Sequence, residues 1–188
     1  DAVLSAVDAL RALGAEVVET PWEDAAAARA IGFLLNRAET AAVHETVART
    51  EADKFALYNP DLRLRVAAGS ILPSELYVNS MRKRAIVRDS MATLFRENRL
   101  NVLLAPTLPT TALTAADMTV TGTDLDEGIG AAWTRLTMPF NTTGQPVLAM
   151  PAGFDPHGLP IGIQLAGAPG REDELFAIGQ VLEGSLGL

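Results

Sequence analysis

Apolar residues recur every three to four positions in several stretches of the chain, and this spacing predicts helices with one buried face. We expect helices over 3–13, 23–49, 75–98 and 171–183. The second stretch is also rich in alanine, the best helix former. Gly14 supplies a stop after the first helix, and Ser74 is a suitable N-cap for the third.

Short apolar runs bounded by turn residues predict strands over 15–19, 101–106, 147–152 and 161–166. Residues 155–160 are expected to join the last two strands as a hairpin. Residues 107–130 are rich in Thr, Pro, Gly and Asp, which predicts a long irregular segment that is functional or mobile. A short helix over 131–138 and a turn over 141–146 complete the expected order. This succession indicates the α/β class, folded as a single segment over 1–188.

Composition narrows the class of protein. The 188 residues are 48% hydrophobic and 20% charged, an ordinary balance for a globular domain that excludes wholesale disorder. The formal net charge of -8 argues against a nucleic-acid partner, because such binding depends on cationic contacts to phosphate. No apolar stretch reaches the length of about 18 residues that predicts a membrane span. The chain has no cysteine, which excludes disulfides and thiolate metal sites and favours a cytoplasmic protein.

Two short patterns resemble catalytic or metal motifs but are incomplete. Ser80-Met-Arg-Lys83 has the S-x-x-K spacing of serine acyl enzymes, yet it lies inside a predicted helix and lacks the partner motifs. Chance spacing is therefore the better interpretation. His44-Glu45 begins like a zinc motif, but Ala48 stands where the second histidine is needed. We expect no metal site and no cofactor.

The basic stretch 82–88 has two interpretations. A charged helix face is most often solvated. The alternative is that one arginine turns inward to hold a carboxylate or to orient a substrate, for which the guanidinium geometry is well suited. Arg84 and Arg88 share one helix face at i, i+4 spacing, so they are the candidates for such a role.

The last third of the chain carries a long succession of motifs: Leu136-Thr-Met-Pro-Phe-Asn-Thr-Thr-Gly-Gln-Pro146, Val147-Leu-Ala-Met-Pro-Ala-Gly-Phe154 and Gly158-Leu-Pro-Ile-Gly-Ile-Gln-Leu-Ala-Gly167. Upstream, Val102-Leu-Leu-Ala-Pro-Thr107 and a helix with Tyr77 and Arg84 fit the same pattern. With these motifs the chain resembles the amidase signature family of serine amide hydrolases. The resemblance implies the C-terminal portion of the amidase signature fold, a mixed β-sheet flanked by helices, with 102–105, 147–152 and 161–166 as central strands.

The family's chemistry is a Ser–cisSer–Lys triad that belongs to an N-terminal part with no counterpart here. Neither Ser80 nor Lys83 matches those positions, so the resemblance assigns no catalytic residue to this chain. It implies the C-terminal part of a longer hydrolase that cleaves the C–N bond of a small-molecule amide. The alternative is a non-catalytic partner or pseudo-subunit that keeps the scaffold without the triad.

What the resemblance implies for this segment is substrate binding. Arg84 matches a helix position that binds the substrate carboxylate in glutamine-using members. Thr134 stands where those members have an aspartate, which favours an uncharged amide. Trp133, Met138 and Phe140 are candidate walls of an apolar pocket, with a core position as the alternative. Because the triad has no counterpart here, we expect the chain alone to be inactive. Apolar strands cut from the rest of their sheet would remain uncovered, so we also expect the chain to associate with itself or to need the N-terminal half.

Overall fold

The structure is a computed structural model, and it describes residues 2–114, 116, 119–120 and 127–187. In the described residues, helices and strands pack together in one fold, five helices preceding the first strand and three more following the third, which confirms the expected combination of a β-sheet with flanking helices. The helices are α1 (Ala2–Ala12), α2 (Ala25–Thr50), α3 (Ala52–Ala56), α4 (Pro60–Ser70), α5 (Ser74–Glu97), α6 (Ile129–Thr134), α7 (Met138–Thr143) and α8 (Glu172–Leu186). The strands are β1 (Val102–Pro106), β2 (Thr119–Val120), β3 (Glu127–Gly128), β4 (Val147–Phe154) and β5 (Pro160–Gly167).

Strand β5 lies between β1 and β4 in a three-stranded sheet whose strand pairs are antiparallel. β4 and β5 form the expected hairpin. Of the three strands expected to be central, β5 is central, whereas β1 and β4 lie at the edges of the sheet that the described residues form. β2 and β3 pair with each other apart from this sheet. The predicted irregular segment 107–130 thus contains one short strand pair, and its residues 115, 117–118 and 121–126 lie outside the described residues.

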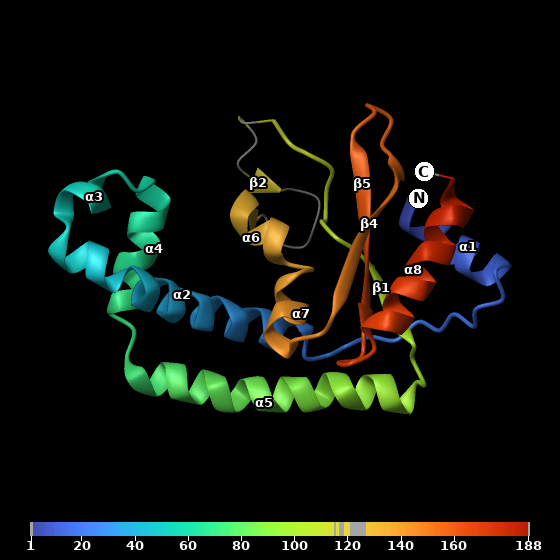
Figure 1. Cartoon of the computed structure of the whole chain (residues 1–188), viewed down its shortest axis with the longest axis horizontal. Coiled ribbons are helices and arrows are strands. Elements are labelled where there is room, and N and C mark those ends of the chain that lie inside the picture. The colour runs from blue at the N-terminus through green and yellow to red at the C-terminus, as the bar shows by residue number, and fades with distance from the viewer. Residues whose placement is uncertain (1, 115, 117–118, 121–126, 188) are drawn as a thin grey trace.

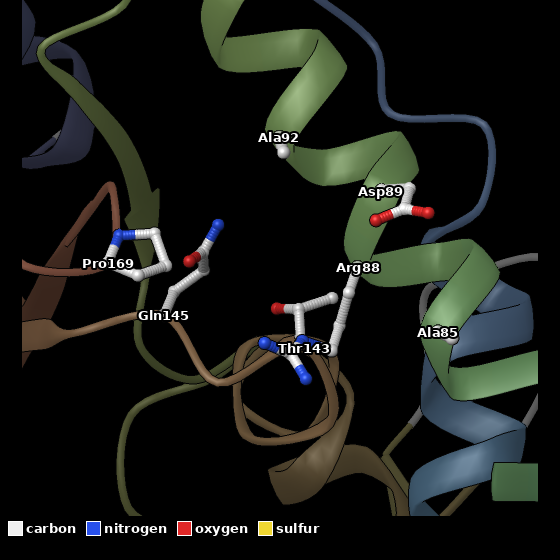
Figure 2. A pocket seen from close by; sticks show the side chains of 7 residues that line it. All are labelled: Ala85, Arg88, Asp89, Ala92, Thr143, Gln145 and Pro169. Carbon is white, nitrogen blue, oxygen red and sulfur yellow. The ribbon is translucent and has the colours of Figure 1, made fainter.

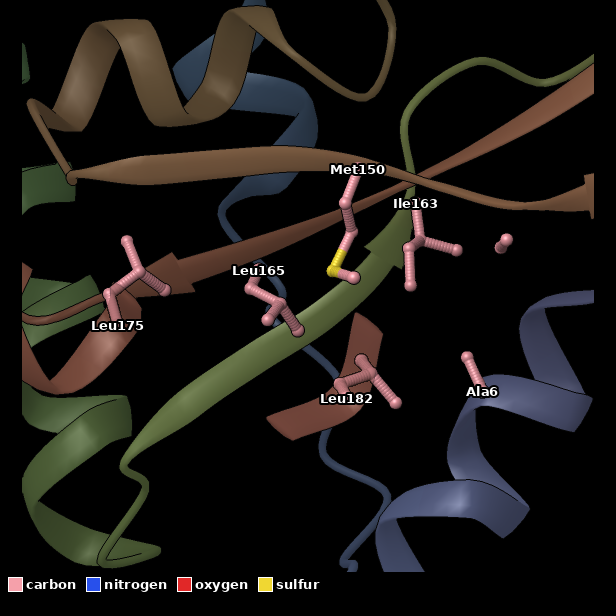
Figure 3. Close-up of a cluster of buried hydrophobic side chains, with 7 residues drawn as sticks. Ala6, Met150, Ile163, Leu165, Leu175 and Leu182 are labelled. Carbon is pink, nitrogen blue, oxygen red and sulfur yellow. The ribbon is translucent and has the colours of Figure 1, made fainter. Parts of the chain in front are cut away.

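Helices α1 and α8 cover one face of the sheet and enclose the main core (Figures 1 and 3). Ile163 and Leu165 point to this face from β5, and both are fully buried. Alternate residues of a strand point to opposite faces, so the residues between them face the other side. The buried members of this core are Ala6, Met150, Ala152, Ile163, Leu165, Leu175 and Leu182.

The opposite face of the sheet contacts a second apolar cluster, which Ala166 of β5 joins to α5 and α7. Its buried members are Met91, Phe95, Phe140 and Ala166. The two long helices α2 and α5 pack together and extend from this face to α3 and α4 at the far end of the molecule (Figure 1). A third cluster, between α2 and α5, is formed by Ala28, Ile31, Leu35 and Val87.

Four local predictions were wrong. Residues 15–19 form no strand, because β-propensity yields a strand only where a neighbouring strand is available to pair with it. Residues 141–143 belong to helix α7 instead of a turn, and α6 ends at Thr134 instead of 138. Ser74 is the first residue of α5, and Pro73 holds the N-cap position.

Candidate functional site

Helix α7 is the point at which the predicted substrate-binding residues meet. Met138 and Phe140 lie on α7 itself, and Trp133 and Thr134 lie on α6 just before it. Arg84 reaches α7 from α5, where its Nε donates a hydrogen bond of 2.7 Å to the carbonyl oxygen of Thr142. The structure therefore gathers residues from two distant parts of the sequence around one short helix.

The sequence of α7 contains a helix start and its own internal support. Pro139 occupies the first turn, where proline is favoured because its missing N–H would be unpaired anyway. The hydroxyl of Thr142 donates to the Met138 carbonyl at 2.9 Å, and that of Thr143 donates to the Pro139 carbonyl at 3.1 Å. Gly144 ends the helix in the left-handed conformation, with φ of 78°. Threonines that suggested a turn thus satisfy their hydroxyls inside a helix.

Arg84 is turned inward, as one of the two interpretations of the basic stretch proposed. Its side chain is half-buried, whereas Arg88, one turn later, is exposed. The last carbonyls of a helix lack partners within that helix and carry partial negative charge. A guanidinium group that donates to one of them stabilises the C-terminal end of α7, and its two terminal nitrogens carry four further N–H donors.

The four candidates on α6 and α7 differ in their surroundings. Trp133 is 39% exposed, which suits a surface wall. The hydroxyl of Thr134 donates to the carbonyls of Gly130 and Ala131 within α6. Met138 lies against α2 at Gly32, where even a methyl group would collide with its sulfur. Phe140 is 9% exposed and belongs to the cluster with Met91 and Phe95.

A surface cavity of about 280 Å³ lies between α5 and the connection from α7 to β4 (Figure 2). Arg88 and Asp89 reach it from α5, and Gln145 reaches it from the connection. The Gln145 Oε1 atom is buried and has no hydrogen-bond partner among the described residues. The cavity is lined by Ala85, Arg88, Asp89, Ala92, Thr143, Gln145 and Pro169, and none of the five predicted substrate-binding residues is among them.

Two polar residues that the sequence analysis did not select also hold this region. Gln164 of β5 is 1% exposed, and its Nε2 donates to the carbonyls of Pro106 and Leu136 at 3.0 Å each. Arg29 of α2 donates to the carbonyl of Ala131 at 2.8 Å. A single polar residue inside an otherwise apolar strand is a signal that could have identified Gln164, because a buried amide needs partners. Nothing local distinguishes Arg29.

The incomplete motifs of the sequence remain incomplete in space. Ser80 is buried on the inner face of α5, whereas Lys83 is exposed, so they do not form a serine–lysine pair. His44 contacts Tyr58, with 3.2 Å between its Nδ1 and the phenolic oxygen. Within the described ranges, no three His, Asp or Glu side chains cluster as metal ligands. None of the helices in those ranges is both long and apolar enough to cross a membrane.

Comparison with known proteins decides the family. The amidase family model matches residues 1–176, nearly the whole chain. The chain belongs to the amidase family. An amidase from Pseudomonas putida is 32% identical over 183 residues, covering 97% of this chain and 38% of the relative. A glutamyl-tRNA(Gln) amidotransferase subunit from Nostoc punctiforme is 29% identical, and the match covers 97% of this chain and 40% of that relative.

The amidase fold is shown by solved structures as well. A crystal structure of an amidase superimposes with a TM-score of 0.86 at 28% identity, over 97% of this chain and 41% of that one. The chain therefore spans about 40% of the length of the amidase relatives that it matches. The family match and the superposition confirm the resemblance and the fold that the motifs indicated.

Proposed function

We propose that this chain is the C-terminal part of an enzyme that hydrolyses a carboxylic amide C–N bond, and that it supplies scaffold and substrate-pocket walls. The observation that carries the proposal is the combination of matches. The chain matches the amidase family over 1–176, yet it covers 38% of the amidase relative from Pseudomonas putida. On this proposal, 1–188 is one segment of a larger domain, and the catalytic triad belongs to the remainder.

The geometry around α7 supports the proposal that residues of this segment form walls of a substrate pocket. Arg84 is held by one nitrogen on the Thr142 carbonyl, which fixes the direction of its guanidinium group. Trp133 is partly exposed on the helix before α7 and presents a large apolar surface. Apolar walls with few oriented polar groups are what small-molecule sites usually contain. We assign Arg84, Trp133, Thr134 and Met138 to the pocket, with Phe140 supporting them from the core.

The substrate that fits this proposal is an uncharged small amide. Thr134 has no charge, and its hydroxyl is engaged by the carbonyls of its own helix. A glutamine substrate carries an α-ammonium group, which a carboxylate at this position would balance and a threonine does not. We therefore expect an uncharged acyl amide to be a better substrate than glutamine.

The test is ammonia release by the intact gene product and by the 188-residue chain. We expect the intact protein to hydrolyse uncharged amides faster than glutamine, and the 188-residue chain to hydrolyse neither. In the intact protein, Arg84→Met should lower kcat/KM by about tenfold, roughly the loss of one charge-assisted hydrogen bond. Arg82→Met, which removes an exposed arginine of the same helix that does not line the cavity, is the matched control and should leave kcat/KM unchanged.

Two results would overturn the proposal. If the sequence that precedes Asp1 in the gene encodes neither a lysine nor a Gly/Ser-rich loop with paired serines, the non-catalytic partner becomes the better assignment. If the 188-residue chain hydrolyses an amide and loses that activity in Ser80→Ala, catalysis belongs to this segment itself.

The proposal includes association of the 188-residue chain, with itself or with the remainder of the enzyme. β1 and β4 are edges of the described sheet, and unpaired edges favour further strand pairing. Light scattering should show dimers or larger species of the chain alone, and a monomer at high concentration would contradict this. A cytoplasmic location is part of the same proposal, and fractionation of cells that make the intact protein tests it.

A further inference from the structure

Gln164 is a fully buried amide in the middle of an apolar strand. It is 1% exposed, and its neighbours Ile163 and Leu165 are completely buried. Burying an amide without hydrogen-bond partners is unfavourable, so a glutamine at such a position requires partners that compensate. The hydrogen-bond partners of the Gln164 side chain therefore indicate its role.

Both donor protons of this amide are used, and they go to two different segments. Nε2 lies 3.0 Å from the carbonyl oxygen of Pro106 and 3.0 Å from that of Leu136. Pro106 is the last residue of β1, and Leu136 lies in the connection between α6 and α7. One side chain thus joins the sheet to the region of the predicted substrate-binding residues.

The sheet leaves room for this side chain to extend. Gln164 is opposite Ala105 on β1 and Ala149 on β4. Directly opposite residues on neighbouring strands have adjacent side chains on the same face. Because both neighbours are alanine, the glutamine can reach past them to the α6–α7 connection, which a larger neighbour would obstruct.

We propose that Gln164 is a positioning residue, which holds the connection 135–137 against the sheet and thereby sets where Trp133, Thr134 and Met138 lie. The connection has the end of α6 on one side and the start of α7 on the other, so a shift of Leu136 moves both helices. The assignment of a substrate effect rests on the proposed function, whereas the positioning itself does not.

The proposed role requires an amide side chain, because it depends on two N–H donors. Methionine has nearly the same length and no donor. Ionised glutamate has no donor either, and it places negative charge beside two carbonyl oxygens; protonated glutamate has one O–H donor. Gln164→Met therefore removes both bonds at almost constant volume, and Gln164→Glu makes one bond available only in acid.

Hydrogen exchange of the 188-residue chain, followed by peptide mass spectrometry, tests the positioning. In Gln164→Met, we expect amides of 129–143 to exchange about tenfold faster, while α8 exchanges as before. Gln145→Met is the matched control, because Gln145 lies two residues after the end of α7 and its Oε1 has no hydrogen-bond partner among the described residues. Unchanged exchange over 129–143, or an equal increase over the whole chain, would overturn the proposal.

A second variant keeps the test decisive if Gln164→Met fails to fold. In Gln164→Glu, protection of 129–143 should be higher below the carboxyl pKa than above it, since only the protonated form can donate. Protection that does not depend on pH in this way would contradict the role of the donors.

Kinetics of the intact protein separate positioning from general stability. A merely less stable enzyme loses active molecules and therefore loses kcat equally for every substrate. A displaced pocket wall changes KM, and it changes the ratio of kcat/KM between a large and a small acyl amide, by about tenfold. Faster exchange with an unchanged ratio would refute the substrate effect alone, and absence of any amidase activity would refute the proposed function instead.

Discussion

The two ends of the molecule differ in how far they bury their apolar side chains within this chain. At the sheet end, Ile163, Leu165 and Leu182 are completely buried between the sheet and its two covering helices. The helical arm, which we define as residues 41–70 and which includes α3, α4 and residues 41–50 of α2, buries few large apolar side chains. Those it exposes are Val43, Leu57 and Leu64, at 78%, 86% and 68%.

This difference indicates unequal local stability. Complete burial of a leucine or isoleucine side chain contributes about 1.5–3 kcal/mol. The sheet end has several completely buried apolar side chains, each with such a contribution, whereas the arm depends on the contact of α2 with α4. We therefore expect the arm to open at a lower free energy than the sheet.

The largest effect should come from the core of the sheet end. Leu182→Ala removes a completely buried side chain on α8, which typically lowers the free energy of unfolding by about 2–5 kcal/mol. Val181→Ala is the control, because that side chain is 55% exposed on the same helix, and it should change stability by less than about 0.5 kcal/mol. Urea unfolding monitored by circular dichroism measures both. Equal effects of the two variants would contradict the location of this core.

An intermediate effect should appear in the arm alone. At Gly69 of α4, an added methyl group would collide with the backbone carbonyl of Arg37 on α2. Gly69→Ala should therefore separate the two helices and lower the free energy of local opening by about 1–3 kcal/mol. Hydrogen exchange should increase in α4 and leave β5 unchanged.

The control for this variant is Gly184→Ala. Gly184 lies in α8, and a methyl group there meets open space, so the change should be neutral or stabilise the helix by less than about 1 kcal/mol. An increase of exchange in β5 upon Gly69→Ala would show that the two ends open together. It would contradict the inference that the arm opens at a lower free energy than the sheet.

The smallest effect concerns the dependence of the sheet end on pH. The backbone N–H of Leu159 donates to the Asp155 carboxylate and lowers its pKa below the ordinary value of 3.8; burial opposes the shift, while the Thr111 hydroxyl and the His157 N–H add to it. A pKa that is lower in the folded state adds stability above pH 3.8, and this contribution is lost as the pH falls through the folded value.

Asp155→Asn should therefore be less stable than the parent chain at neutral pH, and the difference should shrink in acid. Thermal unfolding between neutral pH and about pH 2 measures this. A difference that stays constant with pH would mean that the charge of Asp155 does not stabilise the hairpin.

Much of the fold could be predicted because its signals are local. Alanine content and apolar spacing predicted α2, α5 and α8 within a few residues, and turn residues predicted the β4–β5 hairpin. The strand expected at 15–19 failed: Val18 is 45% exposed, and none of the strands in the described ranges pairs with this segment. The helix α7 was missed because its threonines satisfy their hydroxyls on carbonyls one turn earlier, which the residue types alone do not reveal.

The candidate site could be predicted only in part. The motif resemblance selected Arg84 and the 133–140 segment, and the structure brings them together through the bond from Arg84 to Thr142. That contact joins residues 58 positions apart, and the bond from Gln164 to Leu136 joins residues 28 apart. Periodicity over one element carries no information on such pairs, because they depend on how complete elements pack.

The short helix α7 also bears on the order of folding. Six residues are too few to form a stable helix alone, because nucleation is unfavourable. Its supports come from Gly32 on α2, Arg84 on α5 and Gln164 on β5, so long loops must close before α7 is held. We therefore expect α7 to form late, with φ-values near zero for substitutions of Phe140. In a chain that emerges from the ribosome, the segment that gathers the candidate residues would be among the last to become ordered.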